Sequence, residues 1–169
     1  MKFSIALLSL FVVGSLGLGA PFGPMAPIPA QVKKSYGLSW DQLNKVCDKN
    51  SKGPALFKEI IGLNSDSGQA TFNVGNDIFD QAREKSNVNE ADWKKWIQEK
   101  CLSNDTLKKV SKSVIDKVQE CVDPKNKLSN SKKLSAQGDL LQLICKEVLA
   151  VAQVDYYPEV APKPGKSKM

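Results

Sequence analysis

The sequence predicts an all-α fold, a compact bundle of about five to six helices joined by two disulfides. Apolar residues recur at spacings of three and four over much of residues 38–156, which is the period of a helix. No convincing run of alternating, β-branched residues indicates a strand. The chain has four cysteines, and an even number favours paired sulfurs.

The first two helices are delimited by capping and breaking residues. Ser39 and Gln42 form a capping box that opens the first helix, whose apolar face includes Leu43, Val46 and Cys47. Gly53 and Pro54 end that helix and begin the next, since proline suits a first helical turn. The second helix ends near Gly62, and its apolar face consists of Leu56, Phe57, Ile60 and Ile61.

Two further helices are expected after a loop at residues 64–68. The third has an apolar face of Phe72, Ile78, Phe79 and Ala82, and Gly75 leaves its continuity uncertain. Asn89 is expected to cap the fourth, with Asp92 in its first turn. The fourth helix includes Trp93, Trp96 and Ile97 and ends at Cys101.

The last two helices have the most regular patterns. Asn104 or Asp105 caps the fifth, in which Leu107, Val110, Val114, Val118 and Cys121 follow one another at steps of three or four. The sixth, roughly residues 136–154, is the most apolar and is expected to be central; its apolar residues are Leu140, Leu141, Leu143, Ile144, Cys145, Val148, Leu149 and Val151.

The two ends of the chain differ from the helical part. Residues 1–20 show a lysine, an apolar run and small residues, the order of a secretory signal peptide with cleavage expected after Ala20. Residues 21–37 are a Pro-rich stretch expected to be a flexible lead-in. Residues 38–156 are the expected disulfide-bonded domain, and residues 157–169 an expected disordered Pro- and Lys-rich tail.

Charge and cysteine usage narrow the function classes. The net charge of +6 falls to +5 without the signal peptide, because that segment contains Lys2 and no acidic residue. The lysines are dispersed, which argues against a nucleic-acid partner. Two disulfides fit an oxidising compartment and leave three pairings open among Cys47, Cys101, Cys121 and Cys145. With no CxxC pair and no histidine, no metal site is expected, and no cofactor is assigned. No segment after residue 20 is apolar enough to predict a transmembrane segment.

The chain has no histidine, which removes the imidazole base of serine and cysteine hydrolases. Carboxylate chemistry remains open, but Asp77 with Asp80, and Glu90 with Asp92, fit helix-surface charges better. No catalytic residue is therefore assigned, and a non-enzymatic protein is expected. Asn104 begins an Asn-Asp-Thr sequon, a permissive site for N-glycosylation, which would compete with its capping role.

A ligand cavity is one use for the aromatic residues. Its expected lining is Phe72, Phe79, Trp93, Trp96, Leu140 and Ile144. The alternative is that these side chains fill the core, which is what buried aromatic residues most often do. The cavity reading predicts a volume of ~300–1,000 Å³ between several helices.

The segment WKKWIQEKCLSNDTLKKV, followed by ECV and LLQLIC, resembles the C-terminal half of the insect 27 kDa haemolymph glycoprotein family. The resemblance covers about residues 40–150 and is specific from Trp93 onward. It implies a secreted, helical, disulfide-bonded protein of body fluid. Family cysteines expected near Val110 and within residues 57–63 are absent, and loss of both partners of one disulfide would keep the count even.

Two functions follow as hypotheses. The leading one is an extracellular binding protein that carries a small hydrophobic ligand between its helices. The alternative is a secreted immune or host-interaction factor that acts through its surface and basic tails. The carrier requires an apolar cavity, whereas the surface factor requires a filled core and an exposed apolar or basic patch.

Overall fold

A computed structural model describes residues 27–49, 66–85 and 88–155. These residues form six α-helices and one short 3-10 turn, with no strand among them. The elements are α2 Pro27–Tyr36, α3 Trp40–Lys49, α5 Asp66–Arg83, α6 Glu90–Ser103, α7 Asp105–Cys121, η1 Pro124–Asn126 and α8 Asn130–Asp155. The all-α prediction is confirmed.

Three predicted caps are present where helices begin. Ser39 and Gln42 bond reciprocally, at 2.8 Å from the Ser39 N–H and 3.2 Å from the Gln42 N–H. The Asn89 side chain accepts from the Asp92 N–H at 2.9 Å, at the start of α6. Asn104 accepts from the N–H of Leu107 at the start of α7. Each cap satisfies a donor that has no intrahelical partner.

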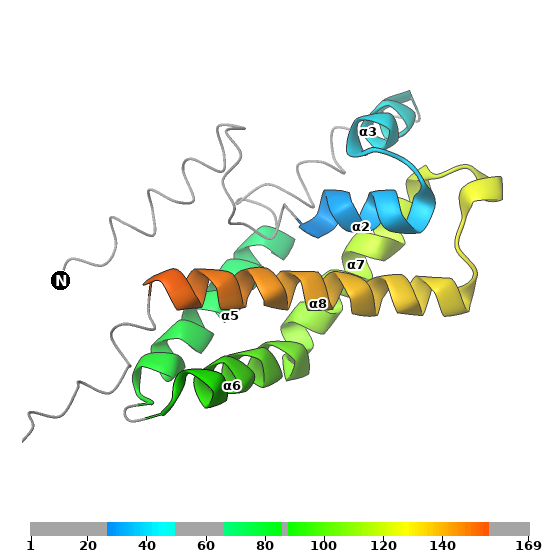
Figure 1. The fold of residues 1–169 in the computed structure, drawn as a ribbon. Coiled ribbons are helices and arrows are strands. Elements are labelled where there is room, and N and C mark those ends of the chain that lie inside the picture. The colour runs from blue at the N-terminus through cyan, green and yellow to red at the C-terminus, as the bar shows by residue number, and fades with distance from the viewer. Residues whose placement is uncertain (1–26, 50–65, 86–87, 156–169) are drawn as a thin grey trace, which may run out of the picture.

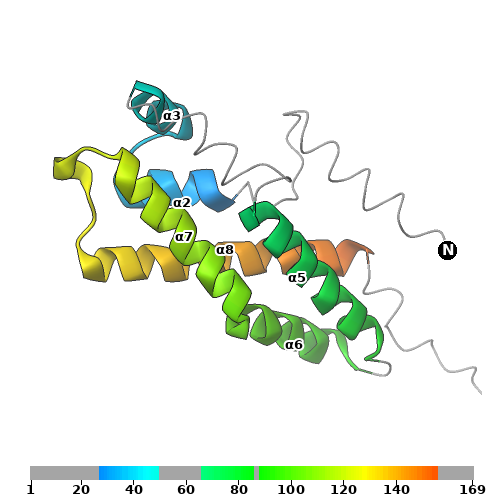
Figure 2. The same ribbon diagram turned by 180° about the vertical axis from the view of Figure 1, so that it is seen from behind.

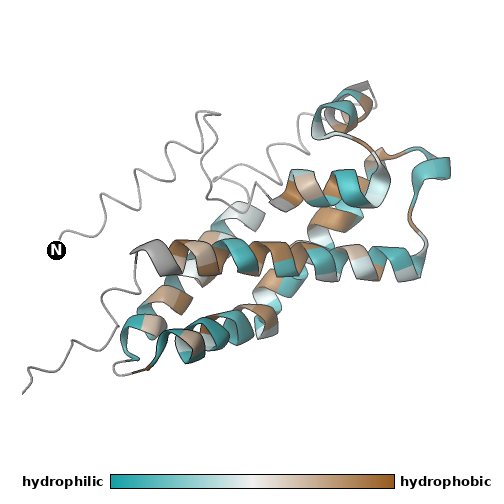
Figure 3. Ribbon diagram, in the orientation of Figure 1, coloured by the Kyte–Doolittle hydropathy of each residue, from teal (hydrophilic) through white to brown (hydrophobic). Residues whose placement is uncertain are grey.

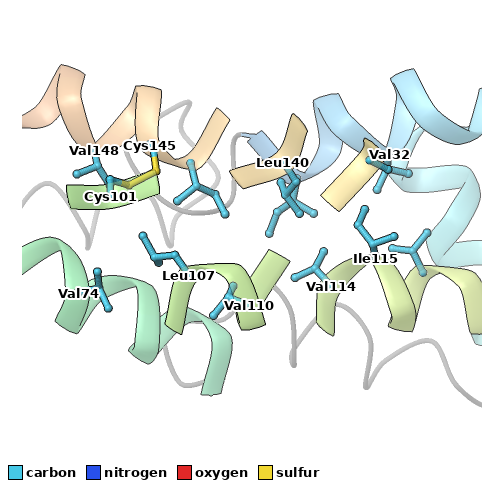
Figure 4. Close-up of a cluster of buried hydrophobic side chains, with 14 of the residues drawn as sticks. Val32, Val74, Cys101, Leu107, Val110, Val114, Ile115, Leu140, Cys145 and Val148 are labelled. Carbon is cyan, nitrogen blue, oxygen red and sulfur yellow. A yellow bond between two sulfur atoms is a disulfide. The ribbon is translucent and has the colours of Figure 1, made fainter. Parts of the chain in front are cut away.

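The central element is α8, which packs against α2, α6 and α7 (Figure 1). Helix α7 crosses it obliquely, and α5 packs on α7 and α6, as the reverse view shows (Figure 2). Side chains of α7 and α8 face one another between Val32 and the Cys101–Cys145 bond (Figure 4). The largest fully buried apolar side chains are Ile28, Val32, Leu43, Trp93, Ile97, Leu107, Val114, Ile115, Leu140 and Ile144.

Two disulfides connect helices that are distant in sequence. Cys47 of α3 pairs with Cys121 of α7, across 74 residues, with their Cα atoms 5.2 Å apart. Cys101 of α6 pairs with Cys145 of α8, across 44 residues, with a Cα separation of 5.6 Å. This is one of the three pairings that the sequence left open. Each bond ties a shorter helix to a longer one, α3 to α7 and α6 to α8.

Helix α2 corrects the prediction of a flexible lead-in at residues 21–37. Pro27 and Pro29 lie in its first turn, where the missing N–H groups would have no intrahelical acceptor. Ile28, Val32 and Tyr36 follow at steps of four and are buried. Gly37, at φ +69°, ends the helix in the left-handed conformation that glycine tolerates.

Two other helix boundaries differ from prediction. Helix α5 starts at Asp66, inside the expected loop, and is continuous through Gly75. Glycine costs a helix ~1 kcal/mol, which burial of neighbours such as Val74 and Ile78 offsets. Helix α8 begins at Asn130, ahead of the predicted start near residue 136. Its first turns are mostly polar, so no apolar pattern marks them in the sequence. The signal peptide, residues 21–26, the second predicted helix and the tail lie outside the described residues.

Candidate functional site

Four of the six residues expected to line a cavity belong to the packed core. Trp93, Leu140 and Ile144 are almost wholly inaccessible, and Phe79 is buried beside them. The Trp93 indole donates to the carbonyl of Ala82 at 3.4 Å, so its polar atom is also satisfied. These side chains fill space between helices rather than surround it.

The other two aromatic residues lie at the edge of the core. Phe72 and Trp96 are half-buried. The ammonium groups of Lys85 and Lys100 lie 4.8 Å and 5.8 Å from the Trp96 ring centroid, within cation–π range. None of the six predicted residues lines either of the two grooves below. The cavity at these positions therefore stays a prediction, while four of the six side chains are buried in the core, as the alternative expects.

The larger groove lies between α2, α6 and α8 and has a volume of about 580 Å³. Half-buried Leu102, Leu143 and Leu149 supply its apolar surface. Exposed polar side chains of α6 and α8 lie at its rim, including Gln98, Gln142 and Lys146. Along α8, the first turns are mostly hydrophilic and the second half is more hydrophobic (Figure 3). The groove therefore has an apolar surface within a polar border.

One buried polar group lines the larger groove. Gln31 of α2 is only 1% exposed, and its Nε2 donates to the Ser35 hydroxyl at 2.6 Å. Its Oε1 is buried and has no hydrogen-bond partner within the described part of the chain. An unsatisfied buried amide oxygen is costly, so a ligand group that could bond to this amide would be favoured.

A smaller groove of about 280 Å³ adjoins the larger one, between α2, the segment before α8 and the first turns of α8. Its polar lining residues include Lys34, Ser35, Lys132 and Ser135. Lys34 and Asp139 line both grooves and form an ion pair of 2.6 Å between them. Helices α2 and α8 are thus connected at the boundary of the two grooves.

The groups with shifted pKa values lie outside both grooves. Burial, together with the negative charge of Asp116, raises the pKa of Tyr36 above its ordinary value. For Asp116 burial opposes ionisation, but hydrogen bonds and charge from Lys112 and Lys133 lower its pKa. Burial raises the pKa of Glu147, against the nearby charge of Lys146. Tyr36 of α2 lies within electrostatic range of Asp116 of α7, and Asp116 also pairs with Lys133 of α8. These described residues form no arrangement of a nucleophile and a base.

The carboxylates considered for catalysis have surface roles. Asp80 pairs with Arg83 at 3.5 Å, and Glu90 pairs with Lys94 one turn along α6. Asp92 accepts from the Asn89 amide at 2.6 Å beside the helix cap. Within the described ranges, no group of three or more His, Cys, Asp or Glu side chains is placed to bind a metal ion. No described helix has the length and apolar character needed to cross a bilayer.

The sequon at Asn104 lies at the junction of α6 and α7. Its Oδ1 is the capping atom, accepting from the Leu107 N–H at 3.1 Å. A glycan would be attached through Nδ2, so capping and glycosylation use different atoms of the side chain. The expected competition between the two roles is therefore not required by this geometry.

Sequence reasoning missed the groove because it missed α2. The spacing of Ile28, Val32 and Tyr36 was the available signal.

Comparison with protein-family models, with curated proteins and with solved structures gives no match for this chain. The resemblance to the haemolymph glycoproteins therefore stays a prediction.

Proposed function

We propose that this protein is a secreted, non-enzymatic binding protein that carries a small, mainly apolar ligand in the larger groove. The observation that supports this most directly is the leucine-lined space of about 580 Å³ between α2, α6 and α8. That volume lies in the range of small-molecule sites, which are concave and largely apolar with a few polar groups. The location differs from the aromatic cavity predicted from sequence.

Extracellular residence is supported by the disulfides and the N-terminal sequence. Both described cysteine pairs are bonded, and such bonds persist in oxidising compartments. Residues 1–20 have the pattern of a signal peptide. The resemblance to insect haemolymph glycoproteins adds a body fluid as the proposed location, and Asn104 is the proposed glycosylation site.

A non-catalytic role is supported by the chemistry of the chain. It has no histidine. The carboxylates at Asp80, Glu90 and Asp92 are engaged in surface ion pairs or caps. Groups whose pKa is shifted by burial often mark active sites, but Tyr36 and Asp116 lie at a helix–helix contact instead.

The test is binding of the neutral fluorescent probe N-phenyl-1-naphthylamine to the full secreted protein. Leu143→Glu places a charge in the groove, whereas Leu134→Glu changes a leucine of the same helix that is 66% exposed and outside both grooves. We expect Leu143→Glu to weaken binding at least roughly tenfold and Leu134→Glu to leave it unchanged, since burying an unpaired carboxylate is costly.

Native mass spectrometry before and after organic extraction is the second readout. A discrete extractable mass on the unreduced protein would identify the ligand class. Absence of any bound mass together with no probe binding would contradict the carrier and favour the surface-acting immune or host-interaction factor. Equal loss of probe binding in Leu143→Glu and Leu134→Glu would place the site elsewhere.

A further inference from the structure

The two grooves adjoin one another and together form one continuous groove along α8. Residues of α8 from Lys132 to Leu149 contribute to one or both of them. At 1.5 Å per residue this stretch is about 26 Å long. The smaller groove adjoins the first turns of α8, and the leucines of the larger groove lie toward its C-terminal half. Both grooves include two lysines and Asp139, so what increases toward the C-terminal half of α8 is the apolar surface.

The smaller groove favours a negatively charged group. Its lining includes two lysines, Lys34 and Lys132, and one aspartate, Asp139. The Ser35 hydroxyl accepts from the Gln31 amide, and its own hydrogen has no acceptor in the described part of the chain. It therefore has a proton to donate. Ammonium groups and a free hydroxyl donor together are the partners that a carboxylate oxygen accepts from.

The ion pair between the grooves is open to exchange. The Lys34 side chain is 67% exposed, and pairs with that much solvent contribute little to stability. A ligand carboxylate that replaced Asp139 would keep Lys34 paired at little cost. Rotation of the Gln31 amide by 180° gives the alternative arrangement, in which Oε1 accepts the Ser35 proton and Nε2, instead of the Ser35 hydroxyl, donates to a ligand acceptor.

We infer that the ligand is an anionic amphiphile, a long-chain carboxylate whose head binds at Lys34 and Lys132 in the smaller groove and whose chain lies on Leu102, Leu143 and Leu149. This inference rests on the proposed carrier function and names its ligand class. Charge complementarity selects the head, and the apolar surface selects the chain. Asp139 is the competitor that the head displaces from Lys34.

The experiment compares dodecanoate with 1-dodecanol, which has the same chain and a neutral head. Each displaces N-phenyl-1-naphthylamine from the full secreted protein at pH 8, below its aggregation concentration. We expect dodecanoate to bind roughly fivefold more tightly or better. Lys34→Met and Lys132→Met are each expected to remove about that factor for dodecanoate and to leave 1-dodecanol unchanged.

Two variants separate local pairing from net charge. Lys109→Met removes an exposed charge of α7 that lines neither groove and should change neither ligand's affinity. Asp139→Asn removes the competitor, so dodecanoate should bind several-fold more tightly, which is opposite in sign to the lysine variants.

The outcomes distinguish failure of the head-group assignment from failure of the carrier function. Equal affinities for the two ligands, unaltered by Lys34→Met, would overturn the head-group assignment while keeping the carrier. If Lys109→Met weakened dodecanoate binding as much as Lys34→Met, the preference for dodecanoate would be an effect of net charge, and the head-group assignment would again be overturned. If neither ligand nor probe binds, the carrier function and this inference both fail.

Discussion

The bond between Cys101 and Cys145 should contribute a large part of the stability, and its removal gives a quantitative test. It closes a loop of 44 residues, which lowers the entropy of the unfolded chain. In the loop-entropy treatment this stabilises the fold by about 4 kcal/mol. Both sulfurs are buried, so replacement by alanine adds a packing loss of about 1 kcal/mol. The total is large beside a typical stability of about 5–15 kcal/mol.

The assay is urea denaturation of Cys101→Ala/Cys145→Ala, followed by circular dichroism and tryptophan fluorescence. We expect the free energy of unfolding to fall by about 4–5 kcal/mol and the dependence on urea to steepen, since an uncrosslinked chain exposes more surface. The matched control is Cys47→Ala/Cys121→Ala, which opens a loop of 74 residues between equally buried sulfurs. Its expected loss is slightly greater, by about 0.5 kcal/mol.

Packing alone would give a different pattern. If the lost sulfur contacts were the whole effect, both double variants would lose about 1 kcal/mol with unchanged urea dependence. That result would refute the loop-entropy argument.

Three further predictions follow from individual side chains. Because the pKa of Tyr36 is raised in the folded state, its contribution to stability is complete below the ordinary tyrosine pKa of about 10 and is lost as the pH rises above it. The unfolding free energy of Tyr36→Phe should therefore fall less steeply between pH 9 and 11 than that of the wild type. The Tyr36 hydroxyl has no described partner, so the same variant should cost little at pH 7. Asn104→Ala should lower stability by about 1 kcal/mol and abolish a glycosidase-sensitive mass, whereas Thr106→Ala should abolish only that mass; an unshifted wild-type mass would exclude glycosylation in that host. Leu140→Ala should cost about 2–5 kcal/mol in urea denaturation, and a loss below about 1 kcal/mol would contradict its placement in the core.

Much of the fold could be predicted because the relevant signals are local. The stripe from Leu107 to Cys121 and the caps at Ser39, Asn89 and Asn104 depend on residues three or four positions apart. The pairing of the cysteines could not be predicted in this way. It depends on which helices cross, and Cys47 and Cys121 are 74 residues apart.

The continuity of α5 and the early start of α8 were also hidden from local patterns. Gly75 weakens a helix in isolation, but burial of Val74 and Ile78 against neighbouring helices outweighs it. The first turns of α8 are polar, so no apolar period marks them. In both places tertiary packing, or its absence, decides what propensity alone leaves open.

The missed helix and the missed site have one cause. Helix α2 has ten residues, fewer than the ~12–15 that an isolated helix needs, so docking of Ile28 and Val32 against α8 must stabilise it. That docking creates both grooves, because α2 supplies Gln31 to one and Lys34 to both. A search among strongly apolar stripes selects the aromatic residues that fill the core. The open surface instead lies where a short, Pro-containing helix leaves the long helix partly uncovered, and that position follows from packing rather than from any single motif.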